Sequence, residues 1–352
     1  MAKTLREIFI EDQIKIEKLS NPNGRSFLEP NNGLVQDSDL GFLANSLESI
    51  DPILKRPLYK FFAFRDLPFR YVGGAKELAS YYKTNYSLSD RNPIASGQNN
   101  VVLTVDVQLE KYSTRISAFS YILKIGMINS MKAQEIGYDI YGEFDNAVNL
   151  QHARMLDQIA FFGLPNVSGS YGLFNHPDIP VEAATTKWEN QGASELFDKI
   201  NSLFLATITR SEFDESMVPD RMLVPLPLFG KLAAPMSVAG SGNATATTGT
   251  SLYNYLRDNL ARDLAGYGAS GLAILPNKYL AAAGTNGTGR ILIYRYNEEA
   301  ARGIMGMELT RGATVYDPHD LAYKTTFVSF VGEPQIIKPG TMQYYDNAAN
   351  AA

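Results

Sequence analysis

Apolar residues recur every three or four positions across residues 143–162, which predicts one long amphipathic helix. A helix of this length would be a rod of about 30 Å. Gly163 and Pro165 predict its end, because glycine can adopt the left-handed cap and proline cannot continue a helix. The positions expected to share its apolar face are Phe144, Ala147, Val148, Met155, Ile159 and Phe162. The polar positions expected mainly elsewhere are Asn149, His152, Arg154, Asp157 and Gln158.

A two-residue alternation is the clearest strand signal in the chain. Every second residue from Val101 to Leu109 is Val or Leu, with mostly polar residues between them. An aromatic-rich stretch at 59–86 precedes this strand, and turn signals within 92–100 separate the two, so we expect a β-hairpin. Because an isolated ribbon is not stable in water, it must pack either in the core of its own chain or on another subunit.

Between the hairpin and the long helix, residues 121–135 are predicted to form a short helix. Ile122, Ile125, Ile128 and Met131 would share one of its faces. Gly137 and Gly142 disfavour a continuous helix into the longer one.

Beyond Pro180 helical and strand patterns alternate. Ser194 is expected to cap one helix and Ser251 another. Strands are expected at 222–225, 272–275 and 291–294. The apolar face of the first helix is Leu196, Ile200, Leu203, Phe204 and Ile208, and that of the second is Leu252, Tyr255, Leu256, Leu260 and Leu264.

Two further stretches lack this alternation. Residues 237–250 are rich in Gly, Ala, Ser and Thr, which predicts a flexible loop. From Met305 onward the pattern is that of strands again. Residues 1–55 show little periodicity and several turn signals, so they read either as a loosely ordered tail or as an extended arm.

Two short motifs carry a family resemblance. Residues 171–180 read Tyr-Gly-Leu-Phe-Asn-His-Pro-Asp-Ile-Pro directly after the long helix, and the chain closes with a proline-rich stretch and Tyr344-Tyr345-Asp346. This order resembles the major capsid proteins of tailed bacteriophages, whose fold encapsulins share. The resemblance covers roughly residues 57–347, although only the helix exit and the ending are motif-like.

The resemblance implies an α+β fold, the tailed-phage major capsid fold. In that family an N-terminal arm lies along neighbouring subunits, and a long hairpin, the E-loop, lies on the next subunit. A long "spine" helix belongs to the peripheral (P) domain, and an α/β axial (A) domain meets its symmetry mates at capsomer centres. The implied divisions are the N-arm at 1–55, the E-loop at 56–120, the P domain at 121–180 and 300–352 with its spine at about 143–162, and the A domain at 181–299.

The function implied is structural. Copies would form the pentamers and hexamers of an icosahedral head around double-stranded DNA, assembled in the bacterial cytoplasm and found in the virion capsid. Since no scaffolding-like domain precedes the core, the resemblance implies either a separate scaffolding protein or self-assembly; portal and decoration proteins are further expected partners. Two alternatives stay open: an encapsulin-type nanocompartment shell, and a soluble α/β sugar-binding protein or enzyme.

The composition of the chain limits the kinds of partner and ligand that it can bind. A net charge of −5 gives no overall basic field, so any contact with packaged DNA would be non-specific and local. The chain has no cysteine, which excludes disulfides and thiolate metal sites, and its three histidines lack ligand spacing. No apolar run reaches the length of about 18 residues that a membrane span needs. We therefore expect no metal, no cofactor and no membrane contact.

No residue is assigned a catalytic role. The serine-hydrolase elbow and the phosphate-binding loop are both absent from the sequence. Four acids near the start of the long helix, Glu135, Asp139, Glu143 and Asp145, read as a solvated face or a favourable helix N-terminus.

The remaining candidate residues also favour structural roles. His152 reads as a polar residue at the surface or at an interface, and His176 as a structural hydrogen-bonding group. Trp188 and the aromatics of 59–86 could stack on a sugar or a base, but packing on a neighbouring subunit is the stronger interpretation. Some capsids of this fold join lysine to asparagine; Lys76, Lys83 and Lys111 lie in the hairpin region, and we assign no such cross-link.

Overall fold

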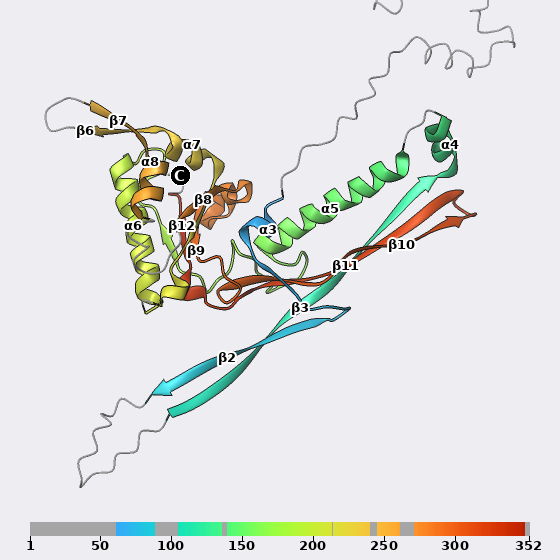
Figure 1. Cartoon of the computed structure of the whole chain (residues 1–352), viewed down its shortest axis with the longest axis horizontal. Helices are drawn as coiled ribbons and strands as arrows, with labels where there is room; N and C mark the ends of the chain where they lie inside the picture. Colours follow the sequence, from blue (N-terminus) through green and yellow to red (C-terminus); the bar gives the residue numbers. More distant parts are fainter. Residues whose placement is uncertain are drawn as a thin grey trace, which may run out of the picture. The chain divides into compact units, whose positions relative to one another are not determined.

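The computed structural model describes residues 61–88, 105–135, 139–212, 214–239, 245–260 and 271–348 (Figure 1). The expected arm at 1–55 and the expected turns at 92–100 lie outside these residues. Helical and strand content are mixed throughout, in agreement with the expected α+β class.

One sheet is built from long strands. Its order is β1-β10-β11-β3-β2, with β1 parallel to β10 and the other pairs antiparallel. The two halves of β3 pair with different strands: Val105 to Arg115 pair with β2, and Ile116 to Gly126 pair with β11. The strands are β1 (Phe69–Tyr71), β2 (Leu78–Leu88), β3 (Val105–Gly126), β10 (Ala301–Asp317) and β11 (Ala322–Ile336).

The helix predicted at 121–135 is wrong in its first part. β3 continues to Gly126, and only Met127–Glu135 form a helix, α4. Leu123 and Ile125 are buried whereas Ile122 is exposed, which is the two-residue alternation of a strand. The spacing of Ile122 and Ile125 fits a helix, whereas that of Leu123 and Ile125 fits a strand. The eleven paired positions along β11 decide for the strand.

The long helix α5 spans Ile140–Phe162, three residues longer at its start than predicted. The Asp139 carboxylate accepts the Gly142 N–H at 3.0 Å and caps it. Gly163, with φ of 91°, ends it as expected. α5 lies alongside β10 and β11 (Figure 1).

The buried face of α5 differs from the predicted one. Its C-terminal half is the more buried, whereas Phe144 near the start is exposed. The 0 % exposed Asp157 accepts the backbone N–H groups of Phe62 (3.0 Å) and Ala63 (2.8 Å), and so caps the short helix α3 (Ala63–Asp66) from a distant part of the chain. The buried residues of α5 are His152, Leu156, Asp157, Ile159, Ala160 and Phe161.

A second sheet has the order β4-β12-β9-β5-β8. Its strands β9 and β12 are buried at every position, and the helices α6 and α7 pack on the sheet to form the largest apolar core. The closing strand β12 lies in this sheet, between β4 and β9. The elements are β4 (Val181–Ala183), β5 (Arg221–Val224), β8 (Ala273–Pro276), β9 (Arg290–Tyr294), β12 (Gln343–Asp346), α6 (Ala193–Arg210) and α7 (Leu226–Ala233).

The predicted face of α6 is buried at every position, but its cap differs. Gly192 precedes the helix, and its N–H donates to Glu195 at 3.2 Å, so Ser194 lies inside the first turn. Ser251 does cap α8 (Leu252–Tyr255), since its hydroxyl accepts the Asn254 N–H.

The loop predicted at 237–250 is partly regular. β6 (Pro235–Ala239) and β7 (Thr245–Ser251) pair as an antiparallel ribbon, because β-branched threonines favour a strand even in a low-complexity stretch. The π-helical segment η2 (Leu256–Leu260) directly continues α8. The short 3₁₀ turns are η1 (Glu215–Met217), η3 (Lys278–Ala282), η4 (Thr285–Gly287) and η5 (Pro339–Thr341).

Candidate functional site

The ribbon of β2 and β3 exposes an apolar face. Tyr82 pairs with Lys111 and Thr84 with Leu109, so alternate residues of both strands point to the same side. Leu109 and Tyr82 each keep 66 % of their surface exposed. Packing in the core of its own chain, one of the two expectations for this strand, is therefore wrong for this face. We call Leu78, Tyr82, Val107 and Leu109 the ribbon face.

A second set of exposed apolar side chains lies where β3, α4 and the β10–β11 turn meet. The Met127 N–H donates to the Leu321 carbonyl at 2.9 Å, which joins α4 to that turn. Exposed apolar surface in a chain that otherwise buries its core marks sites of interaction with other molecules. We call Ile122, Ile128, Met131, Val315 and Leu321 the tip cluster.

The two motif-like stretches come together in the fold. Asp346 of β12 forms a two-point ion pair with Arg290 of β9, at 2.6 and 2.8 Å, and both are buried. Arg290 also donates to the carbonyl of Phe174, and the Tyr344 hydroxyl donates to that of Leu173 at 2.7 Å. The Tyr344–Asp346 stretch near the C-terminus thus holds in place the segment that follows α5.

Burial by itself would raise the pKa of Asp346. Hydrogen bonds from Arg290 and Thr285 outweigh that effect and leave the pKa below its usual value. Thr285 donates through both its backbone N–H and its hydroxyl, each at 2.8 Å. The carboxylate is therefore charged and fully bonded in the folded chain.

The exit motif itself is held by close backbone contacts. The Gly172 N–H donates to Asn175, whose amide donates back to the Phe162 carbonyl at 3.0 Å. A Cβ at Gly172 would lie 2.2 Å from the Phe161 carbonyl carbon, so only glycine fits there. Phe161 and Phe174 stack with their ring centroids 4.5 Å apart. Gly172, Phe174 and Asn175 of the motif therefore each have a structural role.

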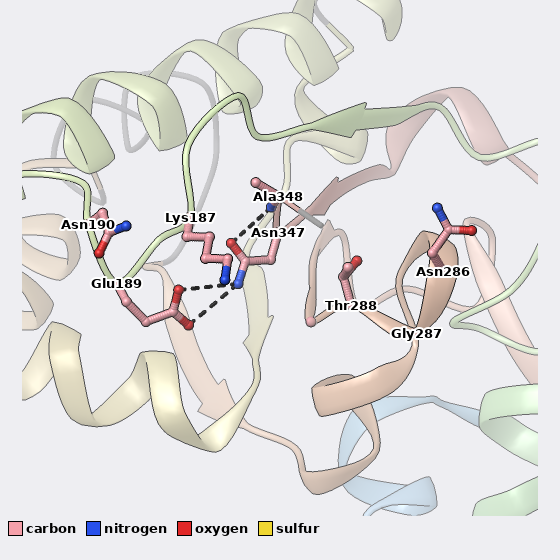
Figure 2. Close-up of a pocket in the computed structure, with 9 residues that line it drawn as sticks. Lys187, Glu189, Asn190, Asn286, Gly287, Thr288, Asn347 and Ala348 are labelled. Carbon is pink, nitrogen blue, oxygen red and sulfur yellow. Dashed lines mark hydrogen bonds between the residues drawn. The ribbon is translucent and has the colours of Figure 1, made fainter. Parts of the chain in front are cut away.

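A polar cavity of about 720 Å³ lies between 187–190 and 286–289 (Figure 2). Asn347 accepts the N–H groups of Trp188 (2.9 Å) and Ala348 (3.0 Å), and its amide nitrogen lies 3.4 and 3.5 Å from the Glu189 carboxylate oxygens. Lys187 points toward the same side chain (Figure 2). These contacts hold the residue after β12 against the 187–190 turn. The side chains that line the cavity therefore serve to join two loops of the chain.

The histidines and the acids near α5 occupy structural positions. His152 was expected at the surface or at an interface, but it is buried within its own chain. Its ring meets Tyr121 edge-on, and its Nδ1 lies 3.4 Å from the Ser329 hydroxyl. Burial lowers its pKa. The Nδ1 of His176 accepts the Asp178 N–H at 3.3 Å, in agreement with its expected structural role. Asp139 and Glu143 lie at the N-terminus of α5, as expected.

Both interpretations of Trp188 were wrong. It is 2 % exposed and packs beside Tyr345 in the core of its own chain, so it reaches neither a ligand nor a neighbour. The aromatics of 59–86 divide, since Phe62 is buried while Phe61, Phe64, Tyr71 and Tyr82 are exposed.

Sequence reasoning missed the importance of Arg290. Arg290 is the first residue of β9, and the other four residues of this strand are Ile, Leu, Ile and Tyr. A lone arginine in such a buried strand indicates a buried ion pair. Among the described residues no group of three His, Asp or Glu side chains could hold a metal ion. In that same part of the chain no helix is both long and apolar enough to span a membrane.

Comparison with known proteins agrees with this geometry. The capsid protein of Myoviridae phage XM1 superposes with a TM-score of 0.69 at 13 % identity, covering 90 % of this chain and 100 % of that one. The capsid of a native GTA particle gives 0.59 at 10 %, covering 92 % and 99 %, and Microbacterium phage Oxtober96 gives 0.57 at 15 %, covering 90 % and 100 %. No curated protein matches the chain.

These superpositions establish the fold, and the family follows from the sequence. The family described as "Major capsid protein" matches residues 90–347, which is well over half of the chain. This chain therefore belongs to the major capsid protein family, and its role is that of a structural capsid protein.

Proposed function

We propose that copies of this chain assemble into the pentamers and hexamers of an icosahedral phage head that encloses double-stranded DNA. The observation that carries the proposal is the ribbon face, whose apolar side chains are exposed in the single chain. Two paired strands without a covering layer are marginal in water, so a second copy is the natural cover. Scaffolding, portal and decoration proteins complete the proposed partners, and the host cytoplasm is the proposed place of assembly.

We further propose a division of labour within the chain. Residues 56–120 act as the E-loop, and α5 acts as the spine of a P domain at 121–180 and 300–352. Residues 181–299 act as the A domain, with β12 contributing a strand to its sheet. Residues 1–55 act as the N-arm. The tip cluster, at the far end of β3 from the ribbon, supplies a second contact between copies.

The proposed interfaces work by repetition. Apolar burial contributes about 25 cal/mol per Å², and the ordering of the partners offsets much of it. Individually modest contacts let a misplaced subunit leave, while a closed shell holds each subunit through many of them.

The test is to express the chain in bacteria, alone and with the neighbouring phage genes, and to examine the product by sizing and electron microscopy. We expect closed shells with fivefold and sixfold clusters of subunits. A stable monomer at all concentrations, with and without those genes, would contradict the proposal. Small shells that hold an enzyme cargo would instead favour a nanocompartment.

A further inference from the structure

A groove of about 530 Å³ lies where the ribbon joins its sheet, between β1, β10 and the start of β2. Three cationic side chains line it: Arg70 on β1, Lys76 on the turn before β2 and Arg302 on β10. Among the described residues no Asp or Glu lines the groove, and none of the three cations has a carboxylate within ion-pair distance. The groove is therefore a local concentration of positive charge in a chain of net charge −5.

Arg302 forms the floor of the groove and is held in place. It is 9 % exposed, whereas Arg70 and Lys76 are exposed at the rim. Its Nε donates to the Gln335 side chain at 2.8 Å, and Gln335 donates to the Thr114 hydroxyl at 2.7 Å. These bonds orient the guanidinium but leave its two terminal nitrogens without an acceptor in the described part of the chain. Buried donors without an acceptor are costly, so the floor is suited to an anion.

The positive charge of the groove is not compensated by the chain. Burial and the nearby charge of Arg70 lower the pKa of Arg302, and the charge of Glu298 offsets only part of that effect. Glu298 does not line the groove. An anion bound among the three cations would remove their mutual repulsion.

The charge and the shape of the groove favour linked phosphate groups. A carboxylate brings a single negative charge, whereas linked phosphates bring several within a short span. Arginine holds phosphate oxygens through two parallel hydrogen bonds, and lysine binds phosphate as a point charge. The volume is typical of small-molecule sites, and a slender anion can reach the buried floor. The convex backbone of a DNA duplex would meet only the rim.

We propose that the groove of Arg70, Lys76 and Arg302 binds the linked phosphate groups of a small polyphosphate, either a free polyphosphate anion or the triphosphate of a nucleotide. Tyr71 and Tyr82 are exposed beside the cations, and tyrosine rings can stack on the base of a nucleotide. The site goes beyond the proposed shell assembly, because a single chain supplies all of its residues.

Calorimetric titration of the unassembled full-length chain with sodium tripolyphosphate tests the site, in a buffer free of phosphate and divalent cations. We expect one tripolyphosphate per chain and weaker binding as salt is raised. Arg302→Gln should weaken binding about tenfold or more, because charge-assisted hydrogen bonds are lost. Slower hydrogen exchange across residues 70–82 should accompany binding to the wild type. Binding that Arg302→Gln leaves unchanged would overturn the proposal.

Further variants separate a lost site from a damaged fold. Because Arg302 is buried, the exposed Arg70→Gln provides a variant that leaves the floor intact and should also weaken binding. Arg302→Lys keeps the charge without the fork, so its affinity should lie between those of the wild type and Arg302→Gln. Lys132→Gln on α4, also exposed, removes the same charge elsewhere and should leave binding unchanged. Equal losses in Arg70→Gln and Lys132→Gln would show only a general charge effect and would overturn the site.

A comparison of ligands distinguishes the sources of the phosphate groups. ATP that binds more tightly than tripolyphosphate would assign a nucleotide, and ATP that binds equally or less tightly would assign a free polyphosphate; both results support the site. Citrate that binds as tightly as tripolyphosphate would overturn it, as would a preference for oligothymidylate with a 5′-hydroxyl end. All of these measurements use the unassembled chain, so their failure leaves shell assembly standing, and binding without any shell would count against assembly alone.

Discussion

At the residue scale, buried polar groups hold this chain together at points that no local pattern reveals. Asp346 and Arg290 join the end of the chain to the exit of α5, and Asp157 caps a helix almost a hundred positions away. Each group is costly to bury alone and tolerable only when paired. Two predictions follow from such groups.

The first concerns the Arg290–Asp346 pair. Asp346→Asn should lower the free energy of unfolding by about 3–5 kcal/mol, because it leaves the Arg290 charge buried without its partner. Urea unfolding of the unassembled chain measures this. Asp258→Asn removes a carboxylate from an exposed pair with Arg257 and should barely move the midpoint. Equal losses in the two variants would contradict the prediction.

The second concerns the buried His152. Since burial lowers its pKa in the folded chain, the unfolded chain binds a proton more readily. Stability should therefore fall as the pH drops below the unfolded pKa of about 6.5. Between about pH 7.5 and 5.5, His152→Gln should make the urea midpoint less dependent on pH than it is in the wild type. Replacing the exposed His319 (His319→Gln) should leave the wild-type pH dependence unchanged. Burial also lowers the pKa of His176 despite Asp178, so His176 should contribute to the slope in both variants.

At the element scale, close backbone approach decides how α5 leaves its sheet. Gly172 lies against the last turn of α5, and the N–H groups of Leu173 and Phe174 donate to Ala160 and Phe161 at 2.9 Å each. The next segment is thereby laid directly on the helix end.

A matched pair of glycine variants tests this packing. Gly172→Ala should cost about 3 kcal/mol or more, because its Cβ would overlap the backbone of Phe161. Gly230→Ala in α7 meets nothing within 4 Å and should be neutral or stabilising, because alanine favours a helix. Thermal unfolding of both variants under one condition makes the comparison; similar melting points would show that the Gly172 contact can relax.

At the scale of the whole molecule, the apolar surface left uncovered points to partners outside the chain. The ribbon face and the tip cluster belong to the two ends of β3, and neither is covered by the described residues of the same chain. In the proposed shell these surfaces become interior.

A charge placed on the ribbon face should separate folding from assembly. Leu109→Asp should reduce the yield of closed particles about tenfold or more, because it buries a carboxylate in an apolar contact, while the unfolding midpoint of the free subunit stays unchanged. Gln108→Asp is the matched control, because it adds the same charge on the opposite face of the strand. Particle counts by electron microscopy decide, and full assembly of Leu109→Asp would remove the ribbon face from the proposal.

Elements with a strong local signal were predictable from the amino-acid sequence. The end of α5 at Gly163, the buried face of α6 and the strand β9 follow from periodicity and backbone chemistry. The exit motif and the chain ending carried the family resemblance. These features were predictable because neighbouring residues alone produce them.

The remaining features depend on contacts between residues that are distant in sequence. Ile122 and Ile125 have the spacing of a helix face, whereas Leu123 and Ile125 have that of a strand face, and pairing with β11 favours the strand. Leu109 alternates like a core residue, yet nothing in the described chain covers it, while Trp188 and Asp157 are buried by segments far along the sequence. Periodicity shows that a face is apolar, but only the arrangement of the other elements determines whether it meets the core, another copy or water.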